Sequence, residues 1–147
     1  MNLTTLIILG ICVAIIALFT RKQKKQHVEV FLDISGSMPI DNATEAIVTM
    51  MGEMRDDIKV SFSTFSMTVH KRVDFNTPLE AAVCLHDKPF VMDLIGAAGG
   101  GTDYTCIPKA LTVPYDYVFV ITDEAEDCKA KIGETPNIVI HSCVDEK

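Results

Sequence analysis

Short apolar runs of strand length alternate with segments of helical periodicity through residues 27–147. Residues 27–34 alternate and then turn apolar, and residues 115–121 are a nearly continuous apolar run; both patterns predict buried strands. Residues 41–57 place a stripe of apolar side chains on one helical face: Ala46, Ile47, Met50, Met51 and Met54. Strands that alternate with helices predict an α/β fold, a three-layer sandwich around a mostly parallel sheet.

The remaining elements are shorter. Residues 58–65 and 68–75 alternate apolar and polar side chains across a tight connection, which predicts a hairpin at a sheet edge. Asn42 and Glu45 have the spacing of a capping box at the start of the helix over 41–57. Further helices are expected at 77–85, 88–98 and 105–111, and a last strand at 137–144.

An uncharged, mostly apolar stretch over residues 3–20 precedes this domain. A membrane-spanning helix needs roughly 17–25 such residues. A cleaved signal peptide carries its positive charge before the apolar stretch, but here the basic residues follow it: Arg21, Lys22, Lys24 and Lys25. We therefore expect a single-pass transmembrane anchor over 1–20, a basic juxtamembrane linker over 21–26 and a folded domain over 27–147. The positive-inside rule places that domain in the cytoplasm and the N-terminus outside.

Charge and cysteine content narrow the class of ligand. All 20 acidic residues follow residue 26, together with nine of the 13 basic ones. A domain this acidic repels phosphate backbones, so we expect no nucleic-acid partner, and it favours cations. The five cysteines are odd in number and none are closely paired, which favours free thiols over a disulfide framework and disfavours a zinc site.

Two of the apolar strands end in an aspartate, Asp33 and Asp123. Because ligands of parallel α/β sheets bind beyond the carboxyl ends of the strands, these carboxylates are candidates for one site. Ser35 and Ser37 follow Asp33 at alternate positions, and Thr102 follows a run of three glycines. The set holds only carboxylates and hydroxyls, which suit Mg²⁺ or Mn²⁺, with Ca²⁺ a weaker candidate. Hydroxyls leave the cation underneutralised, so we expect a vacant position for an outside carboxylate.

These three segments resemble the metal-ion-dependent adhesion site of von Willebrand factor A domains. The phrases that carry the resemblance are Asp-Ile-Ser-Gly-Ser-Met, Gly-Gly-Gly-Thr-Asp and Val-Ile-Thr-Asp, and they look most like compact intracellular members from bacteria and phages. The resemblance implies a Rossmann-like fold and metal ligation by Asp33, Ser35, Ser37, Thr102 and Asp123, directly or through water. It also implies a non-catalytic role, in which a partner protein's acidic side chain completes the coordination.

Two other functions stay open at this point. Residues 31–35 are similar to the nucleophile loop of haloacid dehalogenase-like phosphohydrolases, although Ser35 stands where that family has a second aspartate. Alternatively, the chain is a structural membrane protein with a vestigial metal site. Glu124 replaces a glycine common in the adhesion-site family, and with Glu126 and Asp127 it either tightens metal binding, repels an acidic partner, or begins a solvated helix. The sequence leaves the partner's identity and the oligomeric state open.

Overall fold

The computed structural model describes residues 3–20, 25–96, 99–133 and 137–143, apart from the side chains of residues 15–20. In chain order the elements are α1 (Leu3–Thr20), β1 (Gln26–Asp33), α2 (Ile40–Glu53), β2 (Ile58–Phe65), β3 (Val69–Phe75), α3 (Pro78–His86), α4 (Lys88–Ile95), α5 (Cys106–Ala110), β4 (Tyr117–Thr122), α6 (Ala125–Ile132) and β5 (Ile138–Ser142).

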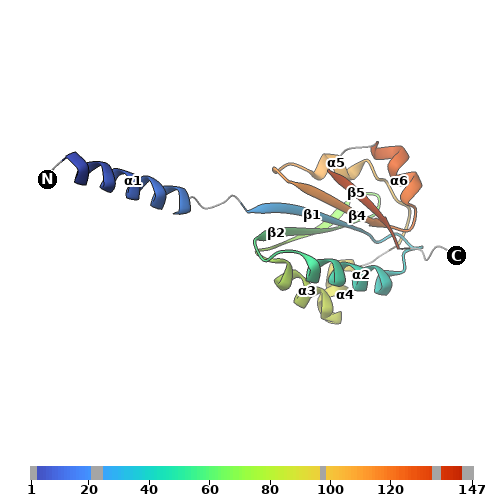
Figure 1. The fold of residues 1–147 in the computed structure, drawn as a ribbon. Helices are drawn as coiled ribbons and strands as arrows, with labels where there is room; N and C mark the ends of the chain where they lie inside the picture. The colour runs from blue at the N-terminus through green and yellow to red at the C-terminus, as the bar shows by residue number, and fades with distance from the viewer. Residues whose placement is uncertain (1–2, 21–24, 97–98, 134–136, 144–147) are drawn as a thin grey trace.

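The strands form a five-stranded sheet in the order β3-β2-β1-β4-β5. β1 is parallel to both of its neighbours, β4 is parallel to β5, and β3 is antiparallel to β2 at one edge. Helices α2, α3 and α4 lie on one face of the sheet and α5 and α6 on the other (Figure 1). The structure therefore confirms the α/β sandwich, the mostly parallel sheet and the edge hairpin.

The central strand β1 separates two apolar clusters. Val28, Val30 and Leu32 belong to the cluster that includes the buried residues of α2 and α3. Phe31 points to the other face and joins a cluster with Phe65 and residues of α5 and α6. Both faces are covered because alternate side chains of a strand point to opposite faces of the sheet. This burial holds the carboxyl end of β1 in a fixed place.

Helix α2 differs from its prediction at both ends. It begins at Ile40 with Pro39 at the N-cap and no side-chain cap, so the capping box expected from Asn42 and Glu45 is wrong. The ring of Pro39 restricts its φ, which is −77°, and this favours a helix that starts at the next residue, Ile40. The helix ends before Met54, whose ψ of 151° is extended. Of its predicted apolar stripe, Ile47, Met50, Met51 and Met54 pack into the core, whereas Ala46 is not part of that cluster.

Helix α3 has the side-chain cap that α2 lacks. The hydroxyl of Thr77 accepts a hydrogen bond from the backbone N–H of Glu80 at 3.2 Å. We expect Thr77→Ala to lower the free energy of unfolding by about 1 kcal/mol, measured by urea denaturation, because one N-terminal amide loses its acceptor. Thr49→Ala is the control, since that threonine lies exposed within α2. An equal loss in both variants would contradict the capping role.

The predicted helix over residues 3–20 is present, but its membrane role is not confirmed. Its described side chains are all exposed, as the helix lies apart from the sheet (Figure 1). Within the described part of the chain, no helix combines the length and apolarity needed to cross a membrane.

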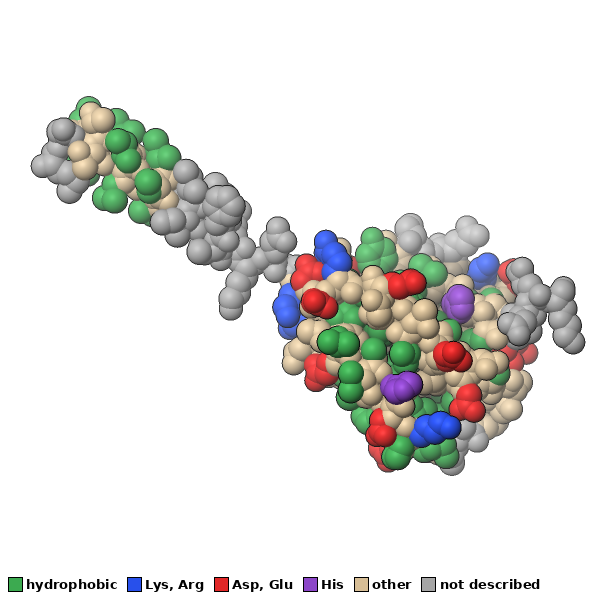
Figure 2. Space-filling model, turned by 60° about the horizontal axis from the view of Figure 1, so that its bottom comes forward, with side chains coloured by type: hydrophobic (Ala, Val, Ile, Leu, Met, Phe, Trp, Pro, Cys, Tyr) green, Lys and Arg blue, Asp and Glu red, His purple; other side chains and the backbone are tan. Residues whose placement is uncertain are grey.

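The surface of the domain matches its acidic composition. In Figure 2, which turns the helices below the sheet towards the viewer, red acidic side chains are spread over the visible face and blue basic ones are few. The cysteines described by the structure are all free thiols, as expected.

Candidate metal centre

Three loops meet at the carboxyl edge of the sheet. β1 and β4 are neighbouring parallel strands, with Leu32 opposite Ile121, so the residues that follow them emerge side by side. The loop after β1 is tied to the glycine-rich loop by two backbone hydrogen bonds, from the N–H of Gly99 to the carbonyl of Ile34 at 3.1 Å and from the N–H of Gly36 to the carbonyl of Gly100 at 3.4 Å. The structure thus brings together the three segments predicted to carry the metal site.

Asp33 lies at the centre of this edge and is fully buried. Its Oδ1 accepts a hydrogen bond from the backbone N–H of Ser35 at 2.8 Å, and its Oδ2 accepts one from the hydroxyl of Thr122 at 2.8 Å. Both oxygens are therefore oriented by the chain itself. Each carboxylate oxygen keeps a second lone pair, which is free to face a cation or a bound water.

The hydroxyl-bearing residues lie on the two loops beside Asp33. Ser35 is buried, Ser37 is exposed and Thr102 is half-buried. The glycine-rich loop requires a glycine at position 100, because the φ of Gly100 is +82°, a conformation that residues with a side chain rarely adopt. The N–H of Asp103 then donates to the carbonyl of Ser66 at 2.9 Å, which fastens this loop to the turn between β2 and β3.

Asp123 provides the clearest sign of a missing electrostatic partner. Its Oδ1 is buried and has no hydrogen-bond partner among the described residues. Leaving a buried charged acceptor without a partner costs at least about 1–3 kcal/mol, which a bound cation offsets. No cluster of three or more His, Cys, Asp or Glu side chains able to hold a metal occurs in the described ranges, so this edge depends on hydroxyls beside two carboxylates. That donor set fits a hard cation such as Mg²⁺.

Two further residues of the site escaped prediction. The hydroxyl of Thr122, at the end of β4, contacts Asp33, and the phenol oxygen of Tyr104 lies 2.8 Å from the Thr122 hydroxyl. Both side chains are buried, and burial raises the pKa of Tyr104. A polar residue at the end of a buried apolar strand is the signal that marks Thr122. Tyr104 carries no local signal, because only the fold brings it there.

The acidic residues after Asp123 form the start of a helix. Glu124 is the N-cap residue of α6, and Glu126 and Asp127 lie in its first turn. All three are exposed, and Glu126 pairs with Lys129 at 3.3 Å. Acidic residues stabilise this end of a helix through its dipole. The structure therefore supports the simplest interpretation of these residues, a solvated helix start.

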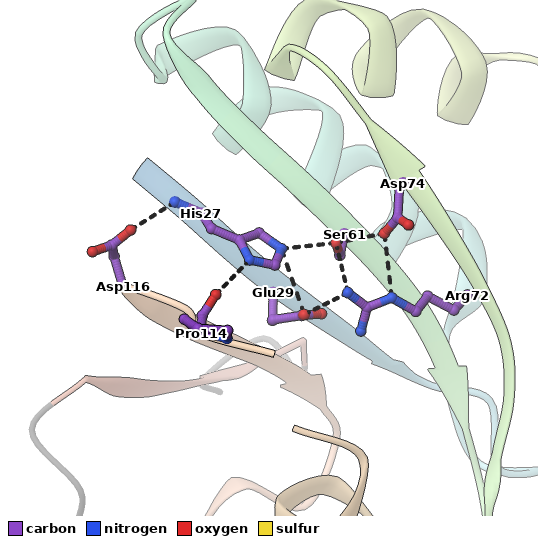
Figure 3. Close-up of polar contacts among 7 residues, drawn as sticks. All are labelled: His27, Glu29, Ser61, Arg72, Asp74, Pro114 and Asp116. Carbon is purple, nitrogen blue, oxygen red and sulfur yellow. Dashed lines mark hydrogen bonds and ion pairs between the residues drawn. The ribbon is translucent and has the colours of Figure 1, made fainter. Parts of the chain in front are cut away.

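A second polar cluster lies near the amino end of β1 (Figure 3), whereas the candidate metal site lies at its carboxyl end. Glu29 on β1 is fully buried, and its Oε1 lies 2.8 Å from Nη2 of Arg72 on β3. Nε2 of His27 lies 2.8 Å from the hydroxyl of Ser61, which donates to Asp74 at 2.6 Å. The five side chains join the first three strands of the sheet through polar contacts rather than apolar packing.

Glu29 is the costly member of this cluster. Burial raises its pKa, and the neighbouring guanidinium of Arg72 acts in the opposite direction. Its Oε2 has no hydrogen-bond partner within the described residues. The pKa of Asp74 is lowered, first by the hydrogen bond from Ser61. The sequence predicted a buried strand over residues 27–34, but it did not indicate a buried ion pair within it.

The strand order, the layers and the three segments at the carboxyl edge agree with the α/β fold that the resemblance to von Willebrand factor A domains implies. No protein-family model matches the sequence, and comparison with curated proteins finds no relative. Among solved structures, an aerotolerance-related membrane protein from Bacteroides fragilis is 19% identical, with a TM-score of 0.53, 78% of this chain covered and 65% of that one. The protein BatB from Bacteroides thetaiotaomicron is also 19% identical, with a TM-score of 0.53 and coverages of 80% and 65%.

A domain from Catenulispora acidiphila described as von Willebrand factor type A is 16% identical, with a TM-score of 0.49 and coverages of 80% and 32%. The chain thus spans about 65% of the length of the two Bacteroides structures. At this level of identity the likeness to the Bacteroides structures concerns the fold alone, and function has to be argued from the site.

Proposed function

We propose that this domain binds a divalent cation, Mg²⁺ or Mn²⁺, and uses it to bind a partner protein that supplies a carboxylate. The proposed ligands, directly or through water, are Asp33, Ser35, Ser37, Thr102 and Asp123. The observation that carries the proposal is the buried, unpartnered Oδ1 of Asp123 at the edge where three loops meet. Mg²⁺ takes six oxygen ligands in octahedral geometry, so five donors leave at least one position open. A partner's carboxylate is a hard oxygen donor that can fill it.

The geometry favours a binding module over the phosphohydrolase alternative. A nucleophilic aspartate needs an oxygen that a bulky phosphoryl group can reach, whereas Asp33 is fully buried. The position of the acid-base aspartate is occupied by Ser35, whose hydroxyl is a poor proton carrier at neutral pH. An assay with an aryl phosphate tests this alternative. Mg²⁺-dependent turnover that is abolished by Asp33→Asn would support the phosphohydrolase function.

The direct test is calorimetric titration of the full chain with Mg²⁺ and Mn²⁺, in mild detergent because α1 exposes apolar side chains. We expect saturable binding by the wild type and none by Asp123→Asn, which keeps the side chain's shape but removes its charge. Asp87→Asn is the matched control, because Asp87 is exposed and caps α4 without a side-chain hydrogen bond. Identical heats for wild type and Asp123→Asn would rule out the site.

The vestigial-site alternative makes a different prediction for partner binding. If the cation bridges the two proteins, a partner captured in Mg²⁺ is released by EDTA and is not captured by Asp123→Asn. If the site is vestigial, the same partner stays bound in EDTA. The comparison follows one defined partner that is supplied at the same concentration in all arms, so that the metal dependence of its capture is measured.

Attachment to a membrane through residues 3–20, with the domain in the cytoplasm, stays a prediction. It is supported by the exposed apolar side chains of α1, among them Leu6, Ile7 and Ile8. Carbonate extraction of membranes from expressing cells tests it. We expect the full chain in the pellet and a chain starting at residue 25 in the supernatant, and a full chain released by carbonate would contradict integral attachment.

A further inference from the structure

A chain of hydrogen bonds connects Asp33 to the aromatic core beneath the candidate metal site. The hydroxyl of Thr122 donates to Oδ2 of Asp33 at 2.8 Å. The phenol oxygen of Tyr104 lies 2.8 Å from the same hydroxyl, and the backbone N–H of Glu124 donates to it at 3.2 Å. One hydroxyl therefore has partners from three segments of the chain, and only one of these partners is a proposed metal ligand.

Counting protons gives this chain a direction. The carboxylate of Asp33 can only accept, so the single hydroxyl proton of Thr122 points towards it. The oxygen of Thr122 must then accept from both the Tyr104 hydroxyl and the Glu124 N–H. With its proton and both lone pairs engaged, the Thr122 hydroxyl has no freedom to rotate away from Asp33.

The far end of the chain is held by packing. Tyr104 is 2% exposed and its ring meets that of Phe65 edge to face, with centroids 6.0 Å apart. Phe65 in turn packs edge to face against Phe31, at 6.4 Å. The phenol oxygen is thus placed by the packing of the second apolar cluster.

We propose that Thr122 and Tyr104 are positioning residues of the metal site, which hold the carboxylate of Asp33 in the orientation that the cation requires. The proposal rests on the metal-binding function proposed above. Hydrogen-bonded partners of a metal ligand limit its rotation, and their loss typically lowers metal affinity 10–100-fold. Neither residue is among the proposed ligands, so their effect on metal affinity would pass through the ligands that they hold, chiefly Asp33.

The test compares the Mg²⁺ affinity of full-length variants by calorimetry. Thr122→Val keeps the shape and removes the hydroxyl, and we expect an affinity roughly 10–100-fold below that of the wild type. Thr122→Ser restores the hydroxyl and should return the affinity to within a few-fold of the wild type. Tyr104→Phe removes only the second donor, and we expect a loss at the lower end of that range, about tenfold.

Two measurements separate positioning from general damage. In a double-mutant cycle, Tyr104→Phe should cause no further loss of affinity when Thr122 is already valine, because its effect passes through that hydroxyl. The electron paramagnetic resonance spectrum of bound Mn²⁺ should change in Thr122→Val and recover in Thr122→Ser. Thr64→Val is the matched control, since this buried threonine donates to the carbonyl of Leu94 instead.

The outcomes distinguish the two levels of the argument. A wild type that binds no Mg²⁺ overturns the proposed function and this inference together. A wild type that binds Mg²⁺ while Thr122→Val binds it equally well, with the same Mn²⁺ spectrum, overturns the positioning role and leaves the function standing. Should Thr122→Val fail to fold, Tyr104→Phe decides the question, because it retains the packing of the core, and an affinity equal to that of the wild type would overturn the positioning role.

Discussion

Replacing Arg72 by methionine should lower the free energy of unfolding by about 3 kcal/mol at neutral pH, the lower end of the range for breaking a buried ion pair. The variant leaves the carboxylate of Glu29 fully buried without the guanidinium that lies 2.8 Å from it. The lower end applies because the side chain of Arg72 is itself 33% exposed. Methionine preserves most of the apolar stem, so the loss reports on charge rather than on packing.

The same variant should show a characteristic pH dependence. Burial already raises the pKa of Glu29, and removing Arg72 removes the main influence that lowers it. A group whose pKa is higher in the folded state stabilises that state below its unfolded pKa, about 4.3 for glutamate. This contribution disappears as the pH rises through the folded pKa. The difference in stability between wild type and Arg72→Met should therefore be small near pH 4 and reach its full value at neutral pH.

Urea denaturation of both proteins at a series of pH values measures this difference. Arg55→Met is the control, because the side chain of Arg55 is 70% exposed and its ion pair with Asp57 contributes at most about 1 kcal/mol. A loss in Arg72→Met that does not change with pH would mean that Glu29 is not the source of the destabilisation. A loss no larger than that of Arg55→Met would mean that the cluster contributes little to stability.

Mg²⁺ should stabilise the folded domain in proportion to its occupancy of the site. At a free concentration 100 times the dissociation constant, linkage predicts about 2.7 kcal/mol. For a domain of this size that corresponds to a rise in Tm on the order of 10 °C. Asp123→Asn should show no such rise. In EDTA, however, it should be as stable as the wild type or more stable, because the unpartnered carboxylate oxygen no longer carries a charge.

Thermal unfolding in EDTA and at increasing Mg²⁺ concentrations measures both parts of this prediction. Asp87→Asn should follow the wild type throughout. Equal Mg²⁺ stabilisation of wild type and Asp123→Asn would place the cation elsewhere. An Asp123→Asn variant that is clearly less stable than the wild type in EDTA would show that the carboxylate has a structural partner, contrary to the geometry described above.

Local sequence patterns predicted much of the fold. The strand over 58–65 has the bounds expected from its alternation, and the strand ending in Asp33 differs from its prediction by one residue at each end. These patterns succeed because the apolar periodicity of a segment depends on which faces it buries, and neighbouring residues record that. The helix cap predicted at Asn42 is wrong because the restricted φ of Pro39 favours a helix start at Ile40. The capping-box pattern does not take this backbone preference into account.

The types and order of the candidate metal ligands were also evident from the sequence, because a carboxylate at the end of an apolar strand has no role in the core. The sequence did not show that these ligands lie close together in the fold. That closeness depends on β1 and β4 being neighbours, and on a hydrogen bond between Thr122 and Asp33 across 89 residues of chain. The burial of Glu29 beside Arg72 likewise depends on strand pairing. The sequence by itself determined the elements and the donor types, since both are local properties. Only the tertiary structure decided which strands pair and therefore which polar groups are buried together. Those contacts join residues that are far apart in the sequence, and no local pattern indicates them.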